Sequence, residues 1–283
     1  MAHVEDRGRR GIVHSDKRLV MSGASHLEPQ GSIVLFEDFL VDVLADSPYV
    51  TVTQSGTAIA AAAISATAGA PGSTALGGWV AGSTDDVDAE IDEVAFGGLG
   101  TGAGTPWMRA DRAGNGMLVA EFGFVIPTAL TARQYFTGLT DDAVEGTATN
   151  GSLNIQTAYT LVDVADDAAG FIFSSLATAP TVWKYAATLA TVGSTVSAAT
   201  EGVTGVVDQY TVNRVEIDSL GNAYFYQSIS GATTSGRKPP TAIGALGLAV
   251  TPTVGLLPKM DIAPTATTTV DWELDYCFAA QRR

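Results

Sequence analysis

The chain has 283 residues, of which 31 are glycine and only 16% are charged. This length suits one large β domain or two smaller domains, and the scarcity of charged helix formers favours strands and turns over amphipathic helices. The formal net charge of −15 argues against nucleic acid as a partner, because so acidic a chain repels a phosphate backbone.

The first 31 residues differ in kind from the rest. They are polar and show no sustained hydrophobic period, so alone they are expected to be disordered. Five basic and four acidic residues give residues 1–30 a charge of +1, whereas 10 basic and 26 acidic residues give the remainder −16. We expect an extended N-terminal arm over 1–31 that a neighbouring subunit orders. The side chains expected to dock on an acidic neighbour are Arg7, Arg9, Arg10, Lys17 and Arg18.

The arginine cluster has one alternative interpretation, nuclear or nucleic-acid targeting. The N-terminus carries no apolar region typical of a signal peptide, and the run 57–70 is too short and too rich in Ala and Thr to span a bilayer. The single cysteine, Cys277, excludes an intrachain disulfide. We expect no membrane partner and synthesis in the cytoplasm.

From residue 32 to 283 the pattern changes to short apolar runs broken by Gly, Pro, Asn and Asp, which predicts one β domain built as a sandwich or barrel. Short helices are expected at 38–45 or 127–131. The Gly-rich stretches 68–78 and 96–106 lack the strand, glycine motif and helix of a dinucleotide site, so no cofactor is expected. Strands are expected at 33–36, 48–54, 117–126, 132–138, 153–162, 170–175, 180–187, 209–218, 222–229, 245–250 and 269–279.

The acidic stretch 84–93 does not match a calcium-binding loop, and a solvated loop is the expected structure. Within "AEIDEVAFG" (89–97), Glu90 and Asp92 would share one strand face, as glucanase carboxylates do. The third carboxylate should stand at position 94, which is Val94, and Glu93 would point away unless a bulge intervenes. We therefore expect an acidic surface strand and no catalytic pair here.

The segment "QYTVNRVEIDSLGNAYFYQSISG" (209–231) predicts a β-hairpin with its turn at Gly221 and Asn222. Alternation along "TVDWELDYCF" (269–278) predicts a half-buried strand whose inner face carries Val270, Trp272, Leu274, Tyr276 and Phe278.

The opposite face of that strand would carry Asp271, Glu273, Asp275 and Cys277. Its three acids could form a glycosidase-like set, a calcium site or a solvated ladder; the ladder is expected, and it could also meet a basic patch of another subunit. Trp272 should lie in the core by alternation, and burial is also expected for Trp107.

All three histidines, His3, His14 and His26, lie in the arm. A Ser-His-Asp, Cys-His or histidine-ligated metal site confined to residues 32–283 is therefore impossible. The arm histidines are spaced too widely for a metal site, so no metal and no enzymatic activity are expected.

The hairpin stretch "VEIDSLGNAYFYQSISG" (215–231) resembles a hairpin common in concanavalin A-like, or laminin-G-like, jelly rolls, and "FEDFL" (36–40) looks like the entry to such a domain. The segment "MLVAEFGFVIPTALTARQYFTGLTDD" (117–142) resembles a strand-loop-strand segment of jelly-roll structural proteins of tailed bacteriophages. The resemblance implies an all-β, antiparallel two-sheet jelly-roll sandwich with an extended arm.

The resemblance further implies a virion structural protein of the capsid decoration or cement type, located on the capsid surface. Its expected partners are the major capsid protein and other copies of itself in a homo-oligomer, for which a trimer would fit a symmetry axis of the shell. The alternative is a carbohydrate-binding, lectin-like module, identified by an exposed aromatic side chain beside Asp, Asn or Arg in a groove. A glycoside hydrolase is the third hypothesis and would need two facing carboxylates in a cleft.

Overall fold

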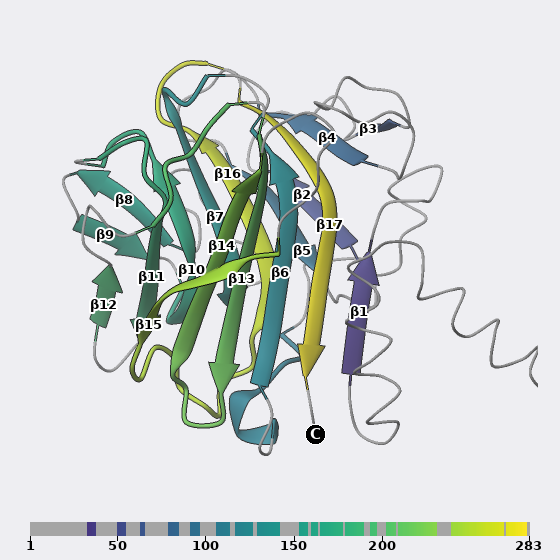
Figure 1. Ribbon diagram of the computed structural model, residues 1–283, viewed down its shortest axis with the longest axis vertical. Coiled ribbons are helices and arrows are strands. Elements are labelled where there is room, and N and C mark those ends of the chain that lie inside the picture. The colour runs from purple at the N-terminus through teal and green to yellow at the C-terminus, as the bar shows by residue number, and fades with distance from the viewer. Residues whose placement is uncertain are drawn as a thin grey trace, which may run out of the picture.

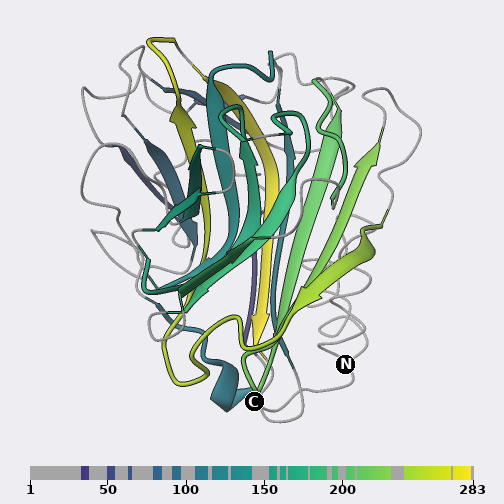
Figure 2. The ribbon, with the colours of Figure 1, turned by 90° about the vertical axis from the view of Figure 1, so that its left-hand side faces the viewer.

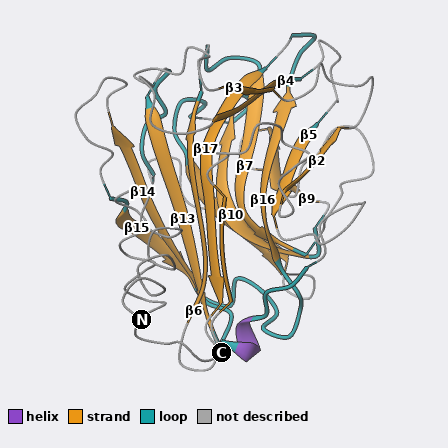
Figure 3. Cartoon of the chain, turned by 90° about the vertical axis from the view of Figure 1, so that its right-hand side faces the viewer, coloured by secondary structure: helices purple, strands orange, loops and turns teal. Residues whose placement is uncertain are grey.

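The computed structural model shows two antiparallel β-sheets packed face to face, which confirms the predicted all-β sandwich (Figure 1). Strands make up almost all of the secondary structure in the described part of the chain, together with one short 3₁₀ helix at Ala110–Arg112 (Figure 3). The residues that the structure describes are 33–37, 50–54, 63–65, 79–84, 91–96, 106–113, 117–126, 129–141, 153–157, 160–163, 165–177, 179–189, 193–196, 202–207, 209–230, 239–268 and 270–281.

The first sheet has eight strands in the order β15-β14-β13-β6-β17-β4-β3, and β1 pairs with the remaining edge of β17 (Figure 1). The C-terminal strand thus has three partners: β6 along one edge, and β4 and β1 along successive halves of the other. The strands of this sheet are β1 (Ile33–Glu37), β3 (Ala63–Ser65), β4 (Trp79–Ser83), β6 (Met117–Val125), β13 (Tyr210–Asp218), β14 (Ala223–Ser230), β15 (Thr241–Leu246) and β17 (Asp271–Gln281).

The second sheet has seven strands in the order β12-β11-β10-β7-β16-β5-β2, and a separate hairpin, β8-β9, lies near β10 (Figure 2). All pairings in both sheets are antiparallel, as expected for a jelly roll. The strands are β2 (Val50–Gln54), β5 (Asp92–Phe96), β7 (Arg133–Thr140), β8 (Leu153–Thr157), β9 (Thr160–Asp163), β10 (Asp167–Ser174), β11 (Lys184–Leu189), β12 (Gly193–Val196) and β16 (Leu257–Pro264).

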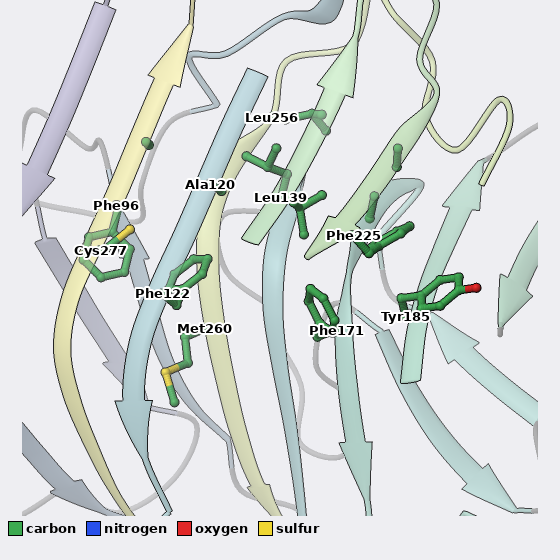
Figure 4. Packing of buried hydrophobic residues seen from close by; sticks show 14 of the residues in the cluster. Phe96, Ala120, Phe122, Leu139, Phe171, Tyr185, Phe225, Leu256, Met260 and Cys277 are labelled. Carbon is green, nitrogen blue, oxygen red and sulfur yellow. The ribbon is translucent and has the colours of Figure 1, made fainter. Parts of the chain in front are cut away.

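The core fills the space between the two sheets. Phe122 on β6 and Met260 on β16 come from opposite sheets, as do Phe225 on β14 and Phe171 on β10, whose rings meet edge to face with centroids 5.6 Å apart (Figure 4). Trp272 is fully buried, as predicted, whereas Trp107 is half-buried and packs at the edge of the core. Burial of this aromatic surface is the main favourable term that holds the sheets together.

A β-bulge in β17 changes the expected alternation of the last strand. The pairing with β6 shifts between Leu274 and Tyr276, so Asp275 is the extra residue. Before the bulge, Leu274 faces the core as predicted. After it, Cys277 joins the core, and Tyr276 and Phe278 lie on the outer face of the sheet, which reverses the prediction for these three residues.

Several other elements have different boundaries in the structure from those predicted. The strand expected at 153–162 is the hairpin β8-β9, and the one expected at 245–250 is β15, which ends at Leu246. Residues 129–131 contain no helix, while the helix expected at 38–45 lies outside the described residues. No helix in the described ranges has both the length and the apolar composition needed to cross a membrane.

Candidate functional site

The β13-β14 hairpin carries the strongest candidate site. Its inward residues, among them Val215 and Phe225, are buried in the core. The alternating outward positions hold Arg214 and Glu216 on β13 and Tyr224 and Tyr226 on β14, all half-buried. Arg214 pairs directly with Tyr226, and Glu216 with Tyr224. We call these four residues the hairpin face.

The turn of the hairpin lies at Gly221 and Asn222, as predicted, and it is built around Asp218. Its Oδ1 accepts hydrogen bonds from the backbone N–H groups of Leu220 (2.9 Å) and Asn222 (3.0 Å), and Oδ2 accepts one from the Asn222 side chain (2.8 Å). Gly221 adopts φ +83°, a left-handed conformation that glycine adopts without steric cost. The turn thereby fixes the register of the two strands that form the hairpin face.

Asp218 also joins the turn to the hairpin face. The Tyr224 hydroxyl donates a hydrogen bond to Asp218 Oδ2 at 3.2 Å. Partial burial opposes ionisation of Asp218, but the hydrogen bonds from Asn222, Leu220 and Tyr224 outweigh it and lower the pKa of this carboxyl group. The same hydrogen bond, the nearby negative charge and slight burial raise the pKa of Tyr224.

Arg214 lies at the centre of the charged part of the site. Its Nε donates a hydrogen bond to Glu216 Oε1 at 2.7 Å, and its Nη2 contacts the same oxygen. Its Nη1 lies 3.5 Å from Glu121 Oε2 on β6, and its Cζ is 5.9 Å from the centre of the Tyr226 ring. The guanidinium is therefore already held by two carboxylates and one aromatic face.

Tyr226 is a neutral, oriented aromatic side chain. Partial burial and then the negative charge of Glu216 raise its pKa. On the edge strand β15, the residue paired with Tyr226 is Ala242 and the residue paired with Tyr224 is Ala245, and both alanines are exposed. Both tyrosines are half-buried, and their neighbours on this edge have only small side chains.

The same sheet face continues toward β1 as an aromatic cluster. Tyr210 and Tyr276 lie over Gly123, where a Cβ atom would meet the Tyr276 ring at 2.0 Å. The hydroxyl of Tyr276 donates to Glu121, and that of Tyr210 donates to the bulge residue Asp275. These buried phenol-carboxylate pairs support the strand that holds Arg214.

The predicted surface acids of β5 are buried instead. Asp92 is 1% exposed and accepts a hydrogen bond from Trp272 Nε1 at 2.8 Å, and Glu93 is 3% exposed. Lys259 Nζ lies 2.9 Å from Glu93 Oε1 and 3.5 Å from Asp261 Oδ1. The prediction of a solvated strand is wrong because each acid has a partner inside the protein. Glu90 lies outside the described residues.

The predicted acidic ladder of the last strand is only partly confirmed. Asp271 and Glu273 are half-buried, but the bulge turns Asp275 into a buried position beside Tyr210. No group of three or more His, Cys, Asp and Glu side chains in the described part of the chain could hold a metal ion. The three acids therefore do not gather into the calcium site considered as an alternative.

The arm and its predicted docking side chains, Arg7, Arg9, Arg10, Lys17 and Arg18, lie outside the described residues, as do the three histidines. The four residues of the hairpin face, Arg214, Glu216, Tyr224 and Tyr226, are not among the site residues predicted from the sequence. The sequence does contain a pattern that indicates this site. An R-x-E pair on one predicted strand is followed, after a tight turn, by a Y-x-Y pair on the next strand, and such pairs lie opposite each other in a hairpin.

No family model and no curated protein matches this chain. A protein of unknown function from Shewanella oneidensis MR-1 has a similar structure, with a TM-score of 0.53 and 9% identity over 89% of this chain and 87% of that one. Peanut lectin has a TM-score of 0.49 and 8% identity over 88% of this chain and 97% of its own. The exoplasmic/lumenal domain of VIP36, in its Ca²⁺/Man₃GlcNAc-bound form, also has a TM-score of 0.49, with 8% identity over 88% of this chain and 90% of its own.

At these identities the likeness concerns the fold alone. The strand order shows two antiparallel sheets, and the similarity to the Shewanella structure extends over 89% of this chain. The protein is an all-β, antiparallel two-sheet sandwich, as the sequence predicts.

Proposed function

We propose that this protein is a non-catalytic carbohydrate-binding domain and that the hairpin face is its binding site. The observation that carries the proposal is the position of Tyr226. Its ring is held by the Arg214 guanidinium and stands beside the Glu216 carboxylate and the exposed, small Ala242. The lectin-like hypothesis asks for an exposed aromatic side chain beside polar groups; Tyr226 is half-buried, and the polar groups beside it are Arg214 and Glu216.

Sugar rings have an apolar C–H surface and a rim of hydroxyl groups. An oriented aromatic side chain covers the first, and fixed hydrogen-bonding groups meet the second. On the hairpin face Tyr224 and Tyr226 are two positions apart on one strand, so their rings stand on the same side about 7 Å apart along β14. Arg214, Glu216 and Asp218 hold these rings in place, which lowers the entropy lost when a ligand binds.

The facing carboxylates on neighbouring strands favour binding over hydrolysis. On the hairpin face, Glu121 and Glu216 are both engaged by Arg214. On the other sheet, Glu93 and Asp261 are cross-strand neighbours. Lys259 lies between them, and all three side chains are at most 3% exposed. A glycosidase needs one free acid and one free base or nucleophile that reach a glycosidic bond, and this buried ion pair offers neither.

Affinity electrophoresis in gels that contain a panel of soluble polysaccharides tests the proposal. The protein should be retarded by at least one polymer, and Tyr226→Ala should weaken that binding by about tenfold, the effect of losing roughly 1.4 kcal/mol of ring contact. Leu176→Ala, at a position 42% exposed in the turn after β10, is the control and should bind as the unaltered protein does. Equal retardation of both variants would exclude the hairpin face as the site.

A second candidate function is the virion structural role implied by the phage resemblance. The observation in its favour is the apolar region at β1, where Val34 is 39% exposed beside the half-buried Phe36 and Phe278. Apolar residues on an edge strand suit contact with another protein chain, such as a second copy or a capsid subunit. Under this proposal the protein resides on the virion surface and assembles as a homo-oligomer.

Light scattering after size-exclusion chromatography tests this second function. A stable oligomer that Val34→Asp converts to monomers would support it, since a charge at a buried contact is costly. A monomer at all concentrations that also fails to bind purified capsids would exclude it.

A further inference from the structure

We infer that the hairpin face selects neutral glycans and rejects chains that carry carboxylate, sulfate or sialate groups; this inference rests on the proposed function above. A site for acidic sugars needs a cation with free hydrogen-bonding capacity, usually an arginine that binds the anion through two N–H groups. On the hairpin face the cation is Arg214. Its Nε and Nη2 contact Glu216, and its Nη1 approaches Glu121.

The net charge of the site also disfavours anionic ligands. Arg214 contributes one positive charge, and Glu216, Glu121 and Asp218 contribute three negative charges, so the sum is −2. The hydrogen bonds that lower the pKa of Asp218 keep that charge in place at neutral pH. An anionic group that approaches Tyr226 therefore meets a net negative potential, in a chain whose overall formal charge is −15.

The polar groups of the site match hydroxyl groups instead. A carboxylate only accepts hydrogen bonds, and a phenol both donates and accepts. Asp218 already accepts hydrogen bonds from Leu220, Asn222 and Tyr224. The carboxylate acceptor beside the rings is therefore Glu216, next to Tyr226. A neutral sugar supplies hydroxyl donors to this carboxylate and to the phenol oxygens, and an apolar ring surface to the tyrosines. Arg214 is then a positioning residue that fixes Glu216 and Tyr226.

Matched polymers test the inference. Polygalacturonate and the same polymer after reduction of its carboxyl groups to hydroxymethyl groups differ in charge but share linkage and length. These two probes join a panel of neutral and acidic polysaccharides, with affinity measured by isothermal titration calorimetry at low ionic strength. Neutral polymers should bind at least tenfold more tightly than acidic ones, and carboxyl reduction should never weaken binding.

The outcomes separate this inference from the proposed function. Tighter binding of acidic polymers that Tyr226→Ala abolishes would overturn the neutral selectivity and leave a carbohydrate-binding hairpin face. Failure of every polymer to bind would overturn the proposed function and the inference with it.

A charge substitution gives a second test. Glu216→Gln removes the carboxylate that holds Nε and Nη2 of Arg214, so the guanidinium becomes available to an anion. The ratio of neutral to acidic affinity should fall by about tenfold, which corresponds to 1.4 kcal/mol. Asp271→Asn is the control. It also removes one negative charge, but at the start of β17, where that strand pairs with β4, and it should leave the affinity ratio unchanged. An unchanged ratio in Glu216→Gln would contradict the assignment of Arg214 as a neutralised cation.

Discussion

The side-chain amide of Asn213 on β13 donates a hydrogen bond to the Thr137 hydroxyl on β7, at 2.8 Å, and joins the two sheets inside the core. The chain of polar contacts continues, because Gln227 Nε2 donates to Asn213 Oδ1 at 2.7 Å and Gln227 Oε1 accepts from the Val203 N–H at 3.1 Å. All three side chains are at most 1% exposed. They thus fix the position of the β13-β14 hairpin relative to the opposite sheet and to the loop at 202–207.

Replacing Asn213 by alanine should lower the free energy of unfolding by about 2–4 kcal/mol, because it leaves the partners of two buried hydrogen bonds unsatisfied. Urea denaturation followed by tryptophan fluorescence measures the loss. The double variant with Thr137→Val should lose less than the sum of the two single variants, since the residues contact each other. Strict additivity would show that the bond contributes nothing.

The buried ion pairs on the outer face of the seven-stranded sheet give a second prediction. Lys259→Met should lower stability by about 3–5 kcal/mol, because Glu93 and Asp261 would then be two buried acids without their cation. Adding Glu93→Gln to this variant should restore part of the loss. A Lys259→Met protein as stable as the unaltered one would contradict the burial of this cluster.

Alkaline pH should destabilise the fold through its buried phenols. Burial is the largest cause that raises the pKa of Tyr135 to about 12, and Arg133 only partly opposes it. In the unfolded chain this tyrosine ionises near its ordinary value of 10.0. Between these two pKa values the unfolded state has lost the proton that the native state keeps, so stability is complete below pH 10 and falls as pH rises by about 1.4 kcal/mol per pH unit.

Urea denaturation at several values of pH from 9 to 11.5 measures this slope. Tyr276, whose pKa is also raised by burial and by Glu121, should add to it. Tyr135→Phe should make the slope shallower, and a slope that the substitution leaves unchanged would contradict the assignment.

Gly123 provides a test of the aromatic cluster on the outer face. In Gly123→Ala the new methyl group would overlap the Tyr276 ring and the Tyr210 hydroxyl, at 2.0 and 2.2 Å, and should cost about 1–3 kcal/mol. Gly247→Ala is the matched control, because its Cβ would meet only Asn222 Oδ1 at 3.8 Å. Thermal unfolding of both variants compares them directly, and equal midpoints would show that the tyrosines do not cover Gly123.

Local sequence signals predicted the hairpin well. Asp218, Gly221 and Asn222 form a turn through contacts within a few residues, and alternation around Val215 is preserved because β13 is regular. The bulge of β17 was not predictable, since its buried Asp275 depends on Tyr210, which is distant in sequence. The same holds for Glu93, whose burial depends on Lys259.

Strand β16 was missed because prolines interrupt its pattern. Pro258 and Pro264 stand near its two ends, where the loss of an N–H donor disrupts the ladder least. The residue types of the candidate site could be read from the sequence, but the fact that they share one outward face could not. Which face of β14 looks outward is decided by the packing of Phe225 against Phe171 on the other sheet, and no local pattern specifies that contact.

The pairing of β1 with the second half of β17 has a consequence for the order of folding. Ile33 pairs with Gln281, so this contact closes a loop that contains nearly all of the other strands. Closing so long a loop costs conformational entropy before the contact can stabilise the sheet, and long-range pairings of this kind slow folding. The eight-stranded sheet is therefore expected to close late and cooperatively, driven by contacts between residues that are far apart in sequence.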